Sequence, residues 1–230
     1  MLPQQRQGSA TPPRGRLALI VGSSLRGEGV PGGDWEVLQR HGEASAYVLP
    51  HRIDHVANLK ALADAGCDRA LAIGSVGGLR PELGPGTFVC PDDFIALDAE
   101  PVTALEGLDA HRVAGFDPKW RGEVLAAFAG AEPEIRDGGV YWQARGPRLE
   151  TPAEIRLAAT YADVIGMTLA SECVVAGELG IRYAAICVVD NLANGVSDVE
   201  LSMEELEQGR ERNRAALQAA MARALPRLEG

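Results

Sequence analysis

The chain has 230 residues, 46% of them hydrophobic, and carries a formal net charge of −10 at pH 7. This length and apolar fraction are typical of one globular domain, and we expect a disordered lead-in at 1–15 before a domain at 16–230. The lack of a Lys/Arg run excludes a nucleic-acid groove as a partner site. No stretch reaches the roughly 18 apolar residues of a membrane span, which excludes a membrane protein of that kind.

The sequence also limits the cellular compartment and the kinds of catalytic site that can be expected. The N-terminal stretch has no apolar core that would make it a secretory signal, and the four cysteines have no CxxC spacing. Buried free thiols in a reducing, cytoplasmic setting are therefore predicted rather than disulfides. Because HExxH is absent we predict no metal site, and because GxSxG is absent we predict no serine-hydrolase site. We also expect no cofactor.

The first predicted strand, residues 16–21, runs into Gly22-Ser23-Ser24. Backbone N–H groups and hydroxyls at such a turn can bind phosphate, although Gly and Ser are also ordinary turn residues. A Gly-rich connection at 26–39 then leads to Arg40-His41-Gly42, where an Arg-His pair is most often solvated surface. We expect a strand at 44–49 and a turn and helix that Gly66 ends.

The next predicted strand, residues 69–73, precedes the small-residue segment 74–79. Two glycines there permit a flat ring to approach the backbone, but a tight turn in a sheet explains them nearly as well. Residues 80–97 read as turn, strand and strand, whereas 98–139 show no clear pattern. Near the C-terminus, Ser202 begins a capping box and a helix whose apolar face packs on the sheet.

The segment 140–191 has the most regular pattern in the chain. A short apolar run ends in a Gly-Pro turn, and a helix follows from about Pro152 with Thr151 as its N-cap. A strand at 163–167, a helix that Gly180 ends and an apolar strand at 183–189 complete a β-α-β-α-β series. Ligands bind at the carboxyl ends of such strands, where this segment places polar residues: Glu150, Thr168, Glu172, Asp190 and Asn191.

These same residues carry a resemblance to a known family. GPRLETPAEIR, ADVIGMT followed by Glu172, and the later Asn191 resemble the signature half of the trimeric purine nucleoside phosphorylases and their methylthioadenosine and methylthioinosine phosphorylase relatives. The resemblance implies an α/β fold with a mostly parallel mixed sheet flanked by helices, and a homotrimer. It also implies inorganic phosphate as co-substrate, bound by Ser23, Arg40, His41, Ser75 and Thr168.

The remaining site residues follow from the same resemblance. The nucleoside is expected to contact Val76, Gly77, Leu149, Met167, Glu172 and Asp190, with Met167 and Glu172 at the ribose. His111 and Phe116 lie where the family contributes to a neighbouring subunit's site, although a plain loop role for both is the simpler interpretation. The chain departs from the family in having Glu43-Ala44-Ser45 after Arg-His-Gly, and no histidine after His111.

The expected chemistry is cleavage of an N-glycosidic bond. The amide of Asn191 can donate to O6 and accept from a protonated N7, while the carboxylate of Glu150 accepts the N1–H of a 6-oxopurine. Adenine-specific relatives place Asp and a small hydroxyl residue at these two positions, so inosine, guanosine or methylthioinosine is predicted. The 5′ group is predicted to meet Met203 or Leu206. A methylthioadenosine phosphorylase, a hydrolase on the same fold and a non-catalytic nucleoside sensor remain the alternatives.

Overall fold

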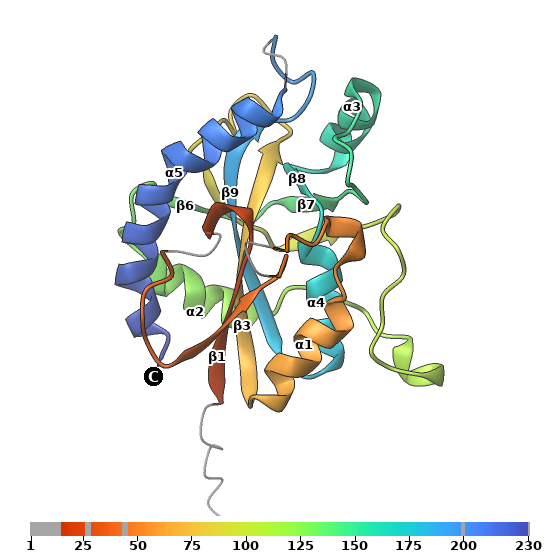
Figure 1. Ribbon diagram of the computed structural model, residues 1–230, viewed down its shortest axis with the longest axis vertical. Helices are drawn as coiled ribbons and strands as arrows, with labels where there is room; N and C mark the ends of the chain where they lie inside the picture. Colours follow the sequence, from red (N-terminus) through yellow and green to blue (C-terminus); the bar gives the residue numbers. More distant parts are fainter. Residues whose placement is uncertain (1–14, 26–28, 43–45, 199–200, 230) are drawn as a thin grey trace, which may run out of the picture.

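The computed structural model describes residues 15–25, 29–42, 46–198 and 201–229. A sheet lies at the centre, with α2 and α5 on one side and α1 and α4 on the other (Figure 1). The strands are β1 (Arg16–Val21), β2 (Trp35–Gln39), β3 (Cys67–Gly78), β4 (Phe88–Cys90), β5 (Asp93–Ile95), β6 (Ile135–Asp137), β7 (Val140–Gln143), β8 (Val164–Gly166) and β9 (Arg182–Leu192). The α-helices are α1 (His55–Asp64), α2 (Pro118–Phe128), α3 (Pro152–Tyr161), α4 (Leu169–Glu178) and α5 (Met203–Ala224). Short 3-10 turns are η1 (Ser23–Leu25), η2 (Pro50–Arg52), η3 (Gly107–Ala110) and η4 (Leu225–Arg227).

The long strand β3 organises the sheet. It pairs in parallel with β9 along one edge, while its other edge pairs first with β1 and then, antiparallel, with β8. Among the described strands the pairings are parallel except for β3 with β8 and β4 with β9. The predicted mixed, mostly parallel α/β sheet is therefore confirmed.

Both faces of the sheet are covered, which explains why its central strands are apolar throughout. Alternate residues of β9 point to opposite sides: Ile186 packs with α2 and α5, and Cys187 packs with α1 and α4. A strand buried on both faces loses the hydrophobic–polar alternation of a half-exposed strand. All four cysteines are buried and free, as predicted.

Several local predictions hold. Thr151 caps α3 with a full capping box, and Ser202 Oγ accepts a hydrogen bond from the Glu205 N–H at the start of α5. None of the helices in the described ranges is long and apolar enough to cross a bilayer. The lead-in at 1–15 falls almost wholly outside the described residues, as does the Glu43-Ala44-Ser45 departure.

Other predictions are wrong. The Gly-rich connection contains β2, which pairs with β1, and the predicted strand at 44–49 does not form over its described residues 46–49. There the Val48 N–H donates to the His41 carbonyl and the Tyr47 ring stacks on His41, so the backbone turns back locally. The indistinct segment 98–139 contains α2, which begins at Pro118 with Asp117 as its N-cap.

Candidate active site

A cavity of about 320 Å³ opens where β1, β3, β7, β8 and β9 end or approach their ends. This volume lies at the small end of the range for ligand pockets in proteins. Of the residues predicted for the site, the lining includes Ser23, Arg40, His41, Ser75, Val76, Gly77, Leu149, Glu150, Met167, Thr168 and Asn191. The convergence of strand ends therefore brings together most of the predicted set, and Glu172 and Asp190 lie behind the lining.

The guanidinium of Arg40 is engaged within the protein. Its Nε and Nη2 donate to the two carboxylate oxygens of Glu172, at 2.6 and 2.9 Å, and its Nη1 donates to the Ile73 carbonyl. Gly22 makes room for this group, because a Cβ there would lie 2.7 Å from Arg40 Nη1. Burial alone would lower the pKa of Arg40, but the attraction of Glu172 outweighs it and the pKa is raised. The pair is thus charged on both sides and close to neutral overall.

Glu172 is not among the residues that line the cavity, and its contact with the ribose stays a prediction. The residue is 1% exposed, and its Oε2 also accepts a hydrogen bond from the Tyr183 hydroxyl at 2.6 Å. Burial would raise its pKa, yet the neighbouring Arg40 holds the pKa of this carboxyl below its usual range. Its place in the structure is that of a buried counter-ion joining α4, β9 and the end of β2.

Asp190 also lies behind the wall of the cavity instead of in it. One carboxylate oxygen accepts the Ser75 hydroxyl, and the other accepts Asn213 Nδ2 of α5 at 2.8 Å. Burial raises the pKa of Asp190, while these two hydrogen bonds act in the opposite direction. Asp190 therefore orients Ser75, which does line the cavity.

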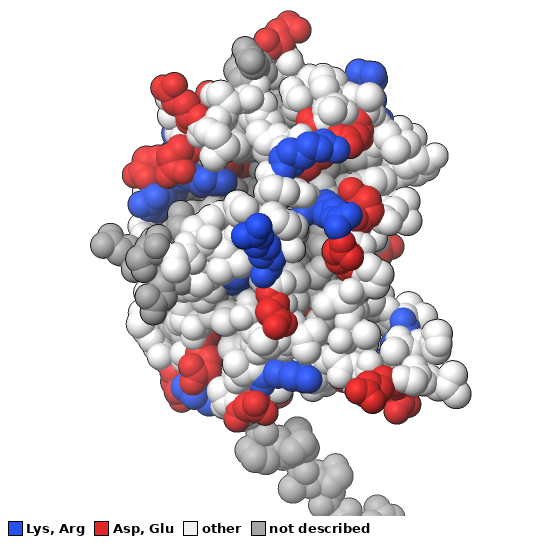
Figure 2. Space-filling model, turned by 45° about the vertical axis from the view of Figure 1, so that its right-hand side comes forward, with Lys and Arg blue, Asp and Glu red and all other residues white. Residues whose placement is uncertain are grey.

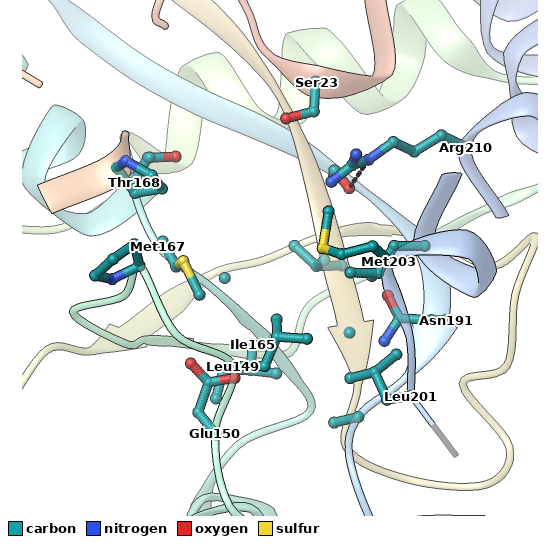
Figure 3. Close-up of a pocket in the computed structure, with 18 of the residues that line it drawn as sticks. Ser23, Leu149, Glu150, Ile165, Met167, Thr168, Asn191, Leu201, Met203 and Arg210 are labelled. Carbon is teal, nitrogen blue, oxygen red and sulfur yellow. Dashed lines mark hydrogen bonds between the residues drawn. The ribbon is translucent and has the colours of Figure 1, made fainter. Parts of the chain in front are cut away.

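Polar groups gather at one end of the cavity. Figure 3 shows Ser23, Thr168 and Arg210 around this end, each from a different element. Thr168 is the N-cap residue of α4, and its side chain makes no capping hydrogen bond. The N-terminus of α4 adds the positive end of a helix dipole here. Its first N–H groups donate within the protein, to the Tyr141 hydroxyl and to Gln143 Oε1. His41 Nδ1 donates to the Val48 carbonyl at 2.9 Å, a bond that fixes the ring's orientation and tautomer.

Glu150 and Asn191 lie toward the other end (Figure 3). Burial raises the pKa of Glu150. Asn191 Nδ2 donates to the Leu192 carbonyl at 2.8 Å, which leaves its second N–H and its Oδ1 to meet a ligand. This end therefore presents a carboxylate acceptor and an amide that both donates and accepts.

Between the two ends the wall is largely apolar. Met203 and Leu206, predicted to meet the 5′ group, both line the cavity. Tyr47, Leu49 and Leu201 join them, and no sequence pattern had suggested those three. A mixed lining of this kind, apolar with a few convergent polar groups, is typical of small-molecule sites.

Arg210 is the charged lining residue that sequence reasoning missed. It stands among alternating Glu and Arg residues of α5, a pattern that indicates a solvated helix face. A signal was present one turn away: Gly209 and Asn213 share the buried face of α5 with Leu206 and Leu217. Small and amide residues on an otherwise apolar helix face indicate a close, hydrogen-bonded contact, and here that contact is with the end of β9.

Other chemistry-bearing residues stand apart from this site. His51 and His55 are four residues apart, but within the described residues no group of three or more His, Cys, Asp or Glu side chains is placed to hold a metal ion. His111 is exposed in the loop before α2. Phe116 is buried against Tyr183 and Phe94, which is a core role.

Known structures share this fold. Methylthioadenosine phosphorylase from Schistosoma mansoni, in complex with adenine, superposes with a TM-score of 0.78 at 21% sequence identity, over 94% of this chain and 93% of that one. At this identity the likeness establishes the fold.

Sequence comparison gives the family. Residues 24–226 match the model of the phosphorylase superfamily. A probable 6-oxopurine nucleoside phosphorylase from Archaeoglobus fulgidus is 41% identical over 192 residues, covering 82% of this chain and 77% of that protein. A probable S-methyl-5′-thioinosine phosphorylase from Methanothermobacter thermautotrophicus is 36% identical over 204 residues, covering 88% and 70%. The chain therefore belongs to the phosphorylase superfamily, as a member of its purine nucleoside phosphorylase family.

Proposed function

We propose that this protein cleaves 6-oxopurine nucleosides by phosphorolysis, giving the free base and a ribose 1-phosphate. The observation that carries the proposal is the division of one cavity into two polar ends. Glu150 and Asn191 stand toward one end, and hydroxyl and cationic groups stand at the other. The relatives named as 6-oxopurine nucleoside and methylthioinosine phosphorylases support the same substrate class.

The reaction exchanges one bond at the anomeric carbon. An oxygen of phosphate forms a bond to C1′ while the bond from C1′ to N9 breaks and its electron pair passes to the purine. Negative charge therefore grows on the base, and a proton at N7 neutralises it. Asn191 stabilises this change by donating to O6 and accepting from N7–H, and phosphate stabilises the positive ribose.

Base recognition follows from hydrogen-bond types. A 6-oxopurine has an N1–H that donates to the Glu150 carboxylate and an O6 that accepts from the Asn191 amide. Adenine has an unprotonated N1 and an exocyclic amine in place of O6. Its N1 is a hydrogen-bond acceptor, and so is the Glu150 carboxylate, so no hydrogen bond forms between them. The buried polar groups would then be left unpaired, which is how such sites reject the wrong base.

The apolar wall supports a 5′-methylthio substituent on the ribose. Leu201, Met203 and Leu206 line this part of the cavity, and the described lining contains no carboxylate other than that of Glu150. A thioether gains free energy on leaving water for such a surface, at about 25 cal/mol per Å² of apolar area buried. We therefore place 5′-methylthioinosine ahead of inosine as the preferred substrate.

One assay tests the reaction class. The enzyme is mixed with inosine or 5′-methylthioinosine, with and without phosphate, and both the base and the sugar product are measured. Phosphorolysis gives the ribose 1-phosphate and requires phosphate. Free ribose formed at the same rate without phosphate would identify a hydrolase, and no cleavage together with tight nucleoside binding would identify a sensor.

We also propose that the protein is a homotrimer whose sites lie near subunit boundaries. The loop before α2 exposes apolar side chains in the isolated chain, with Leu97 at 82% and Leu108 at 86%. Exposed apolar side chains of this size are typical of surfaces that a second chain covers. The proposal rests on these side chains and on the family resemblance.

A further inference from the structure

The phosphate end of the cavity needs a positive charge that Arg40 does not supply in full. Phosphate near pH 7 is largely a dianion, and binding it out of water requires charge compensation as well as hydrogen bonds. Arg40 and Arg210 are the arginines of the described lining, which contains no lysine. Three of the five N–H donors of Arg40 are used, and Glu172 already balances its charge.

Arg210 is placed to supply that charge. Its side chain is 19% exposed and projects from α5 into the cavity, toward Ser23 (Figure 3). Nε lies 3.5 Å from Ser75 Oγ, and Nη1 lies 3.2 Å from the Glu207 carboxylate, which is mostly exposed at the rim. The ion pair with the exposed Glu207 is weak. The buried carboxylate of Asp190 also attracts Arg210, but it acts across Ser75 and forms no direct ion pair with the guanidinium. Arg210 is therefore less fully neutralised than Arg40, which pairs directly with buried Glu172.

The neighbouring groups hold Arg210 in this direction. Ser75 has a single hydroxyl proton and donates it to Asp190, so the lone pairs of its Oγ face Arg210. Asn213, one turn further along α5, donates to both Asp190 and the Val189 carbonyl. Gly209 lets the helix touch the strand, because a Cβ there would lie 1.9 Å from the Asp190 carbonyl oxygen. The helix is thus fixed at the residue that precedes Arg210.

We propose that Arg210 is a phosphate-binding residue and the main compensating charge for the phosphate dianion, with Asp190 and Ser75 as its positioning residues. This inference rests on the proposed phosphorolysis. It assigns to α5 a direct part in binding the nucleophile, in addition to its apolar wall at the 5′ group.

The test compares Arg210→Gln and Arg210→Lys with Arg212→Gln on the same helix. Arg212 is about half exposed, pairs with Glu205 and does not line the cavity, so it controls for a change of charge on α5. The KM for phosphate and the KM for the nucleoside are measured separately. Calorimetric titration with inorganic phosphate alone gives a second readout that does not depend on turnover.

Arg210→Gln should raise the KM for phosphate roughly ten- to hundredfold, the usual range for loss of a charged hydrogen-bond partner. The KM for the nucleoside should change little. Arg210→Lys should recover part of the phosphate affinity, because it restores the charge but not the planar set of N–H donors of a guanidinium. Melting temperatures of all three variants identify a change that comes from folding alone.

The two proposals fail in different ways. Wild-type enzyme that cleaves nucleosides equally well without phosphate would overturn the phosphorolysis. Wild-type enzyme that depends on phosphate, together with an Arg210→Gln variant whose phosphate KM and titration match those of Arg212→Gln, would overturn only the role of Arg210.

Discussion

We expect Asn191 to decide which base the cavity accepts. In Asn191→Asp the amide donor becomes a carboxylate, which repels O6 of a 6-oxopurine and accepts from the exocyclic amine of adenine. The ratio of kcat/KM for inosine over adenosine should shrink by about two orders of magnitude, since unpaired buried polar groups set such ratios. Parallel assays on both nucleosides measure it, and an unchanged ratio would place base recognition elsewhere.

Protonation of Glu150 should lower kcat/KM at acid pH, which would appear as an acid limb of the pH profile. The proposed contact requires the carboxylate, and burial raises the pKa of Glu150 above its ordinary value of 4.5. As pH falls through this raised pKa the group takes up a proton and no longer accepts the N1–H, so kcat/KM for inosine declines. A pH profile of kcat/KM measures the limb, which should be absent from the weaker activity of Glu150→Gln. A limb of the same position in both enzymes would assign it to another group.

Glu172 is expected to act on stability. Glu172→Gln keeps the size of the side chain but leaves Arg40 charged, buried and without its counter-ion. The free energy of unfolding should fall by about 3–5 kcal/mol, the range for breaking a buried pair from one side. Urea denaturation measures it. Glu211→Gln, which breaks a surface pair with Arg214, should cost under about 1 kcal/mol. Equal, small losses in both variants would show that the buried pair is solvated.

Two glycines in helices provide a matched comparison. Gly209 in α5 lies against the Asp190 carbonyl, whereas Gly122 in α2 has nothing within 4 Å of a Cβ placed there. Gly122→Ala should stabilise the fold by up to about 1 kcal/mol through helix propensity. Gly209→Ala should lower the melting temperature, because backbone atoms must move apart. Thermal denaturation compares the two variants, and a rise in both would mean that α5 is not packed tightly on β9.

Helices and strands were predictable where their signals are local. Thr151 and Pro152 mark the start of α3 within a few residues of sequence, and the apolar run at 183–189 marks a buried strand. The full length of β3 was not predictable, since its last residues, Gly77 and Gly78, have low strand propensity and are held by pairing with β8 and β9. β2 follows a Gly-rich stretch and forms because its backbone pairs with the free edge of β1.

The site was predictable to the extent that single residues follow strands. Ser23, Thr168 and Asn191 come at the ends of apolar runs, which marked them as candidates. Thr168 joins the others for a reason that the sequence does not show, because β8 runs antiparallel to β3 and leads back toward the end of β1. The ion pair between Arg40 and Glu172 joins residues 132 positions apart, and no local pattern indicates that one arginine is neutralised. Arg210 was missed because its local pattern was misleading. It stands in a helix segment rich in charged residues, which is typical of a solvated face.

The surface as a whole does not attract anions. The chain has a net charge of −10, and on the face in Figure 2 basic side chains are interspersed with acidic ones. Attraction of phosphate over long range is therefore weak, and screening at physiological salt confines each charge to roughly 8 Å. The affinity for phosphate must come from groups inside the cavity.

The proposed homotrimer can be tested by measuring the size of the assembly in solution. Sedimentation velocity at micromolar concentration should show a trimer. Leu108→Asp should shift the distribution toward the monomer, because a charge then faces the partner surface, while Leu157→Asp on the exposed side of α3 should not. A wild-type protein that sediments as a monomer would contradict the proposed homotrimer.

The position of α5 in the chain has a consequence for synthesis. The ribosome delivers α5 after the nine strands of the described residues, yet α5 supplies Arg210, Met203, Leu206 and the Asn213 that holds Asp190. Until α5 has been made, the cavity of a nascent chain lacks these side chains, and its wall is complete only when Gly209 docks on β9. The complete cavity is therefore a late product of synthesis, made after the strands that form most of its wall.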